Sequence, residues 1–215
     1  MPPSGEPGQV RRFHPAVRRV HRATAVLVGI CVGTAACLYI PSLTILVGHR
    51  YLVERTHVYA GLALPIPLLL GLLSAHVRAD LRRLNRFSVT DKRWLRKAPR
   101  RSGTLRVGKF NAGQKLNGAL SAGAIGVLLG TGLLMHFTWL VRLSLRTGAT
   151  FVHDWTALAF GLLLAGHLWR AARDPDALQG MRTGDVPERW ARQHHAAWAD
   201  ELLGPETPDP VVPGG

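Results

Sequence analysis

Cysteine is scarce in this 215-residue sequence, which contains only Cys31 and Cys37. Two cysteines are too few to staple a small domain, and neither belongs to a Cys-x-x-Cys-His motif, which attaches haem covalently. A separation of six residues places the two side chains on different faces of one helix, so we expect them not to form a disulfide. The sequence therefore excludes a disulfide scaffold and a c-type cytochrome.

Acidic residues are also scarce, because 13 Asp and Glu stand against 27 Lys and Arg and give a formal net charge of +14. An excess of this size is typical of nucleic-acid binders and of membrane proteins with basic loops. Hydrophobic residues make up 47% of the chain, which excludes an intrinsically disordered protein. The positions of the basic residues decide between the two remaining classes.

Four long stretches carry almost no charge. Residues 23–40 and 58–77 contain no Lys, Arg, Asp or Glu, and residues 116–140 and 151–169 contain only Asp154 between them. A helix of about 20 apolar residues crosses a hydrocarbon core of about 30 Å. The sequence therefore predicts an all-α membrane protein, a four-transmembrane-helix bundle.

Basic residues are unevenly distributed among the polar segments between these spans. The N-terminal arm, the C-terminal segment and the central segment are rich in them, and residues 78–109 alone contain twelve Lys or Arg. The other two connections contain two arginines each. This alternation follows the positive-inside rule and places both termini in the cytoplasm. We expect a multi-pass protein of the cell inner membrane that contacts the lipid bilayer and no nucleic acid.

Histidine is the polar residue that marks the span ends. His153 and His167 are 14 residues apart on the fourth span, which puts them on nearly one face and about 21 Å apart along the axis. Because successive spans run in opposite directions, His21 lies at the depth of His167, and His57 lies at the depth of His153. The sequence predicts two bis-histidine sites, one above the other. Neutral imidazole pairs suit low-spin haem iron, and two such sites would form a transmembrane electron wire.

Other assignments stay open at this point. His14, His76 or His136 could replace one of the four ligands. A histidine-based metal or proton transporter is an alternative, but it calls for carboxylates near the histidines, and only Asp154 is close. A haem-free membrane anchor would explain the spans, although it leaves the depth-matched histidines unexplained.

Local signals refine this picture. Pro65 and Pro67 predict a kink in the second span. Residues 187–203 predict a short interfacial helix with Trp190 and Trp198 on its apolar side. Arg55, two residues before His57, is a candidate partner for a haem propionate at the outer surface.

Several motifs together resemble one known family. These are the Arg-x-x-His of residues 18–21, the Arg-Thr-His of residues 55–57, the 14-residue gap between His153 and His167, and the run Lys-Phe-Asn-Ala-Gly-Gln-Lys at residues 109–115. The chain resembles the di-haem cytochrome b (gamma) subunit of membrane-bound respiratory formate dehydrogenases, within the wider bacterial cytochrome b561-like family. The histidine pattern alone also suits related hydrogenase or thiosulfate-reductase cytochromes.

The resemblance implies two haem b groups. His57 and His153 would ligate the outer haem, and His21 and His167 the inner one. Arg22 is a departure, because the family commonly has tryptophan after the first histidine. His14 and His76 are therefore the fallback inner ligands.

The resemblance also implies a menaquinone site at the cytoplasmic side, lined by Asn111, Gly113 and Gln114 together with His167. The same run has a structural interpretation, since Asn111 is a good N-cap and Gln114 completes a capping-box pair. The two roles are compatible.

The function implied is that of an electron-transfer and quinone-reducing subunit. It would relay electrons from an extracytoplasmic oxidoreductase, by resemblance a formate dehydrogenase with molybdenum and iron–sulfur subunits, through two b haems to menaquinone. A hydrogenase or another molybdenum oxidoreductase is the alternative partner. The expected division of the chain is a disordered N-terminal arm at residues 1–10, a di-haem cytochrome b domain at 11–172 and a cytoplasmic tail at 173–215.

Overall fold

The structure is a computed structural model, and it describes residues 8–96 and 105–205. The described chain is predominantly helical, with one two-stranded sheet. The long helices are α1 (Pro15–Tyr39), α3 (Arg50–Ala63), α8 (Ala112–His136) and α9 (Leu143–Ala172). The shorter elements are β1 (Gln9–Arg11), α2 (Pro41–Val47), α4 (Pro65–Gly71), α5 (Ala75–Leu84), α6 (Val89–Trp94), α10 (Pro175–Thr183), β2 (Asp185–Pro187), α11 (Glu188–His194) and α12 (Ala196–Leu203).

Three helices, α1, α8 and α9, are long and apolar enough to cross a membrane, and the stretch formed by α3 and α4 gives a fourth when it is counted with α5. Large apolar side chains face outward from these helices and their connections, as at Ile45 and Leu73, which are each 80% exposed. Contiguous exposed apolar surface is what a lipid-facing bundle requires. The prediction of a helical membrane protein is confirmed.

The second span differs from its expected course. The helix breaks at Leu64, and Pro65 begins α4, so the kink predicted from the prolines is confirmed. After Gly71 the chain turns, and α5 runs at 107° to the span. The span thus begins earlier and ends earlier than residues 58–77. His76 lies outside it, at the start of an arginine-bearing helix, because charged residues favour the membrane surface.

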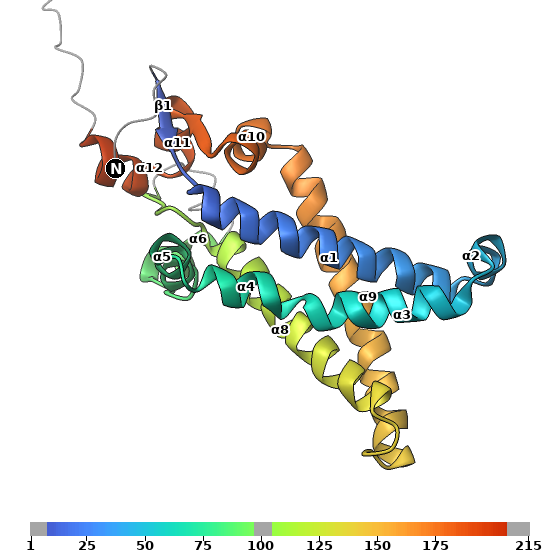
Figure 1. The fold of residues 1–215 in the computed structure, drawn as a ribbon. Coiled ribbons are helices and arrows are strands. Elements are labelled where there is room, and N and C mark those ends of the chain that lie inside the picture. Colours follow the sequence, from blue (N-terminus) through green and yellow to red (C-terminus); the bar gives the residue numbers. More distant parts are fainter. Residues whose placement is uncertain (1–7, 97–104, 206–215) are drawn as a thin grey trace, which may run out of the picture.

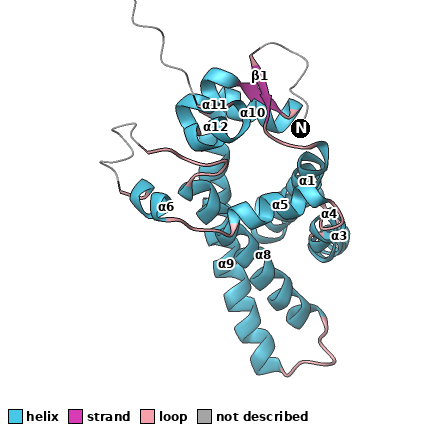
Figure 2. Ribbon diagram, turned by 90° about the vertical axis from the view of Figure 1, so that its left-hand side faces the viewer, coloured by secondary structure: helices cyan, strands magenta, loops and turns pink. Residues whose placement is uncertain are grey.

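The bundle consists of two helix pairs. Helix α1 lies along α3 and α4, and α8 lies along α9; the pairs diverge toward the connections 40–49 and 137–142 (Figure 1). We call this the connection end. At the opposite, terminal end lie β1, α5, α6 and the helices α10–α12 (Figures 1 and 2). Gly71 lets α4 approach α1 closely, because a Cβ there would lie 2.6 Å from Val20 Cγ2.

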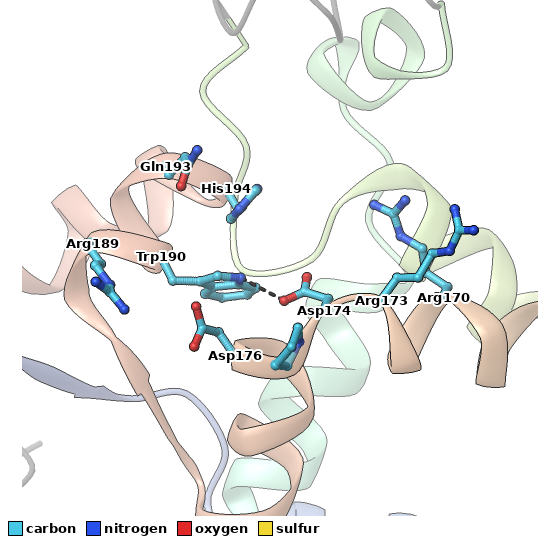
Figure 3. A pocket seen from close by; sticks show the side chains of 9 residues that line it. Arg170, Arg173, Asp174, Asp176, Arg189, Trp190, Gln193 and His194 are labelled. Carbon is cyan, nitrogen blue, oxygen red and sulfur yellow. Dashed lines mark hydrogen bonds between the residues drawn. The ribbon is translucent and has the colours of Figure 1, made fainter.

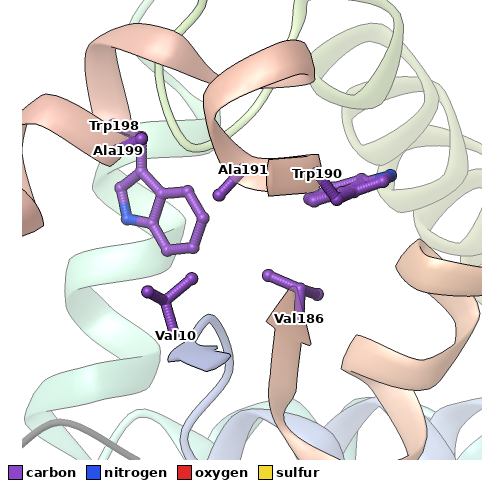
Figure 4. Packing of buried hydrophobic residues seen from close by; sticks show 6 residues of the cluster. All are labelled: Val10, Val186, Trp190, Ala191, Trp198 and Ala199. Atoms are coloured by element: carbon purple, nitrogen blue, oxygen red, sulfur yellow. The ribbon is translucent and has the colours of Figure 1, made fainter. Parts of the chain in front are cut away.

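A small folded unit, the terminal module, joins the two ends of the described chain. Strands β1 and β2 pair antiparallel, with Val10 opposite Val186. These valines pack against Trp190, Ala191, Trp198 and Ala199 (Figure 4). Residues 1–7 of the expected disordered arm lie outside the described residues, but Gln9 and Val10 are ordered in β1 because Val10 is buried in this cluster.

The C-terminal segment also differs in detail from the expectation. Instead of one helix over residues 187–203, α11 and α12 form a helical pair separated at His195. Trp190 and Trp198 do share the apolar side, and both are buried. They pack inside the terminal module, and not against a membrane surface, because Val10 and Val186 supply the apolar partner.

Buried polar contacts tie this module to the segment before α8. His195 Nδ1 lies 2.6 Å from Gly108 O, and Arg12 Nη2 lies 3.1 Å from His195 Nε2 and 3.1 Å from Lys109 O. The ring therefore donates from Nδ1 and accepts at Nε2, so it is neutral. Burial, followed by the nearby Arg12 charge, lowers the pKa of His195 to about 3. These contacts fix the chain that leads into Asn111.

We predict that the terminal module loses stability on acidification. Unfolded His195 binds a proton below about pH 6.5, whereas the folded ring resists protonation, so stability is complete above that pH and falls toward pH 3. Between pH 7 and pH 5 the free energy of unfolding of the terminal module falls by about 2 kcal/mol. Hydrogen exchange of the α11 and α12 amides, corrected for intrinsic rates, measures it.

Variants at two neighbouring histidines test whether His195 causes this loss of stability. His195→Gln keeps hydrogen-bonding groups but does not titrate, so its exchange protection should change little between pH 7 and pH 5. His194→Gln, at an exposed position, should retain the wild-type loss. Equal protection at both pH values in the wild-type protein would contradict the assignment.

Candidate functional site

Four histidines meet in two pairs between the helix pairs. His57 of α3 faces His153 of α9 at the connection end, with ring centroids 6.4 Å apart and planes at 66°. His21 of α1 faces His167 of α9 at the terminal end, with centroids also 6.4 Å apart and planes at 52°. We call these the connection-end pair and the terminal-end pair. The structure brings together the same two pairs that depth and helical face predict.

The protonation of His57 follows from its neighbours on α1. Its Nδ1 lies 3.2 Å from Cys31 O and 2.9 Å from Thr34 Oγ1. A carbonyl oxygen only accepts, so Nδ1 carries the proton. The Thr34 hydroxyl donates to Ile30 O at 2.6 Å and is left to accept from the ring. The unprotonated Nε2 is therefore the nitrogen available to a metal.

His153 has the same kind of partner on α8. Its Nδ1 lies 2.9 Å from Thr131 Oγ1, and that hydroxyl donates to Val127 O at 2.7 Å. Because the single hydroxyl proton is engaged with the helix carbonyl, the ring must donate. The ring packs against α8 at Gly132, where a Cβ would sit 3.6 Å from His153 Cε1, an ordinary van der Waals distance. Both members of the connection-end pair thus expose Nε2.

The rings of the terminal-end pair have fewer hydrogen-bond contacts among the described residues. His167 Nδ1 lies 3.5 Å from Asn117 Nδ2, at the long limit for a hydrogen bond. Among the hydrogen bonds of the described residues, none involves the His21 ring. Sequence reasoning did not single out Asn117, Thr34 or Thr131.

The remaining candidate histidines lie elsewhere. His14 and His76 stack on each other with ring centroids 3.8 Å apart and planes at 16°, and His14 Nδ1 accepts from Ala16 N. His136 packs edge-on against Phe137. None of the three is a member of the two facing pairs.

The run that begins α8 forms a reciprocal cap. Asn111 Oδ1 accepts from Gln114 N at 2.9 Å, and Gln114 Oε1 accepts from Asn111 N at 3.0 Å. The predicted capping box is confirmed. Gly113 packs closely on Trp94, because a Cβ there would lie 3.0 Å from that ring and the ring would have to shift.

Two buried ion pairs brace this cap, and sequence reasoning missed both. Lys115 Nζ lies 2.7 Å from Asp91 Oδ2, and Lys109 Nζ lies 2.5 Å from Asp80 Oδ1. Burial raises the pKa of Asp91, but hydrogen bonds from Lys115 and Ser88 outweigh it and hold that pKa below its usual value. The lysines at the two ends of the run 109–115 therefore anchor the beginning of α8 to α5 and α6.

Charged groups also gather near the connection-end pair. The Arg55 guanidinium lies 5.1 Å from the centroid of the Tyr51 ring, a cation–π contact within α3. Asp154, directly after His153, accepts a hydrogen bond from the Tyr39 hydroxyl. Among the described residues, Arg55 contacts tyrosines and forms no ion pair with a carboxylate.

A cavity of about 520 Å³ lies where α9 meets the terminal module. Arg170 lines it from the last turn of α9 and Arg173 from the residue after that helix, and Trp190 and His194 line it from α11 (Figure 3). The indole of Trp190 donates to Asp174 Oδ1 at 3.0 Å. The cavity begins one helical turn beyond His167, and none of the predicted site residues lines it.

Sequence comparison identifies the family that carries this arrangement. A profile of the prokaryotic cytochrome b561 family matches residues 12–184, which is most of the chain. The chain belongs to this family. The resemblance read from the motifs is thereby confirmed.

Curated relatives of this cytochrome b561-family protein are similar over a shorter stretch. The nitrate-inducible formate dehydrogenase cytochrome b556(Fdn) subunits of Escherichia coli K12, Escherichia coli O157:H7 and Shigella flexneri are each 29% identical over 99 residues. That stretch covers 45% of this chain and 46% of each relative, so the match spans about half the length of the relatives.

Membership of a cytochrome b family implies haem b, and the histidine pairs fit that group. Two iron–imidazole bonds of about 2 Å, with ring radii of about 1 Å, place two ring centroids about 6 Å apart across one iron. The observed separation is 6.4 Å in both pairs. The neutral Nδ1–H form of His57 and His153 also presents the lone pair that axial ligation needs.

Proposed function

We propose that this chain relays electrons from an extracytoplasmic oxidoreductase, a formate dehydrogenase with molybdenum and iron–sulfur subunits, through two b haems to menaquinone. The observation that carries the proposal is the pair of facing imidazoles in each tier, with equal separations that suit bis-axial ligation. The relatives are cytochrome subunits of formate dehydrogenases, which supports the choice of partner.

The four histidines are the proposed axial ligands. His57 and His153 would hold one haem, and His21 and His167 the other, through their Nε2 atoms. Bound haem iron would supply reversible one-electron transfer. Arg55 is proposed to pair with a propionate at the connection end.

The beginning of α8 is the proposed menaquinone site. The side-chain oxygens of Asn111 and Gln114 are used in the cap, but their NH₂ groups have no hydrogen-bond partner among the described residues. Those groups can donate to a quinone carbonyl while the cap stays intact. Asn117, one turn along α8, contacts His167, so this face of the helix leads to the terminal-end pair.

The topology proposal places the terminal end in the cytoplasm and the connection end outside it. The basic segments support this orientation, since α5 carries Arg78, Arg82 and Arg83 at the terminal end. The protein would then be a multi-pass component of the inner membrane that reduces quinone on the cytoplasmic side. The division into an arm (1–10), a di-haem domain (11–172) and a tail (173–215) remains part of this proposal.

Haem stoichiometry tests the ligand assignment. We predict that the purified protein binds about two b haems per chain, and that His57→Ala or His21→Ala leaves about one. Pyridine haemochrome absorbance against protein concentration gives the ratio. His49→Ala, at an exposed position before α3, is the matched control and should keep both haems.

A colourless but well-folded wild-type protein would reject the proposal and favour a histidine-based transporter or a haem-free anchor. Loss of haem in His49→Ala but not in His57→Ala would reject the assignment of the ligands.

Quinone kinetics test the α8 site. Asn111→Ser and Gln114→Glu keep a capping oxygen but remove the NH₂ donor, so we predict intact haem content and about tenfold slower electron transfer to quinone, the cost of one hydrogen bond. Stopped-flow oxidation of the dithionite-reduced protein by a menaquinone analogue measures the rate. Asn85→Ser, at the end of α5, is the control. Wild-type rates in both α8 variants would rule this site out.

A further inference from the structure

The two histidine pairs differ in the hydrogen-bond partners of their Nδ1 atoms. Both rings of the connection-end pair donate Nδ1–H to a threonine hydroxyl at 2.9 Å, Thr34 for His57 and Thr131 for His153. In the terminal-end pair, the one side-chain hydrogen-bond contact among the described residues is that of His167 Nδ1 with Asn117 Nδ2, at 3.5 Å. The hydrogen-bonding support is thus concentrated on one tier.

Each threonine is itself fixed by its helix. Thr34 Oγ1 donates to Ile30 O at 2.6 Å, and Thr131 Oγ1 donates to Val127 O at 2.7 Å. This bond to the carbonyl four residues earlier sets the hydroxyl rotamer and aims a lone pair at the neighbouring helix. A threonine on α1 thus fixes the tautomer and orientation of the His57 ring, and a threonine on α8 does the same for the His153 ring.

Such a hydrogen bond changes the ligand electronically. Donation from Nδ1–H makes the imidazole a more basic ligand at Nε2. A more basic ligand stabilises ferric iron more than ferrous iron, so it lowers the reduction potential. Two donated hydrogen bonds on one iron act in the same direction.

Fixed charges lie near both tiers, so the hydrogen bonds carry the difference between them. Asp154 follows His153 directly and opposes the gain of an electron there, whereas Arg55, two residues before His57, favours it. Arg22 directly follows His21 and favours reduction at the terminal-end pair.

We propose that Thr34 and Thr131 are positioning residues that hold His57 and His153 by their Nδ1–H groups and thereby make the connection-end haem the lower-potential haem of the two. The inference rests on the proposed haem ligation and adds the two residues that set the potential of the connection-end haem.

Redox titration of the full-length purified protein tests it. Thr34→Val and Thr131→Val remove a hydroxyl and keep the branched shape. Each variant should raise the lower of the two reduction potentials. The reduced-to-oxidised ratio of that haem at a fixed applied potential should rise about threefold, which is roughly 30 mV at 59 mV per tenfold. The higher potential should stay unchanged. His21→Ala, which leaves the connection-end haem alone, assigns the components.

Matched variants separate tuning from loss of structure. Thr34→Ser and Thr131→Ser restore a hydroxyl and should restore the wild-type potential. Thr147→Val removes a hydroxyl that also donates to a helix carbonyl, Leu143 O, but contacts no histidine among the described residues. It should titrate as wild type. The electron paramagnetic resonance signal of the ferric connection-end haem should shift only in the two histidine-contacting valine variants.

The outcomes are distinguishable from failure of the proposed function. A wild-type protein without haem would overturn both the function and this inference. Two haems whose potentials are unaltered by Thr34→Val and Thr131→Val, or altered equally by Thr147→Val, would overturn the threonine role alone. The two threonines lie on different helices, so either variant suffices if the other does not fold.

Discussion

The distance between facing imidazoles is the constraint on which the rest of the bundle depends. Both pairs have ring centroids 6.4 Å apart, close enough for one iron between them and too far for direct ring stacking. Helix α9 supplies one ring to each pair, so it must face α1 near one end and α3 near the other. The pairing of α1 with α3 and of α8 with α9 gives α9 that position. The caps and ion pairs at the terminal end then hold the helices in register.

Helix α8 supports this arrangement by packing along α9. Asn117 and Thr131 are 14 residues apart, the same spacing as His153 and His167, and the antiparallel pairing brings Thr131 to His153 and Asn117 to His167. One polar residue per tier therefore meets each α9 imidazole in an otherwise apolar span. This repeated spacing was visible in the sequence, and it would have found the partners of two histidines. Thr34 had no such signal. It lies on α1, and the ring that it contacts, His57, lies on the neighbouring helix α3.

The sequence patterns that succeeded were those with a helical period. Uncharged spans predicted the long helices, the 14-residue spacing put His153 and His167 on one helix face, and Asn111 with Gln114 predicted a cap. Contacts between distant segments carried no periodic signal. The bond between Arg12 and His195, 183 residues apart, arises from tertiary packing, and no period predicted the 107° turn before α5. For the same reason a strand formed within the arm expected to be disordered.

An experimental map of the purified protein tests the central claim most directly. Cryo-electron microscopy at a resolution that shows side chains should reveal planar porphyrin density between His57 and His153 and again between His21 and His167, with the iron bound to Nε2 of each ring. Density that joins either pair directly, or porphyrin bound through His14, His76 or His136, would contradict the account.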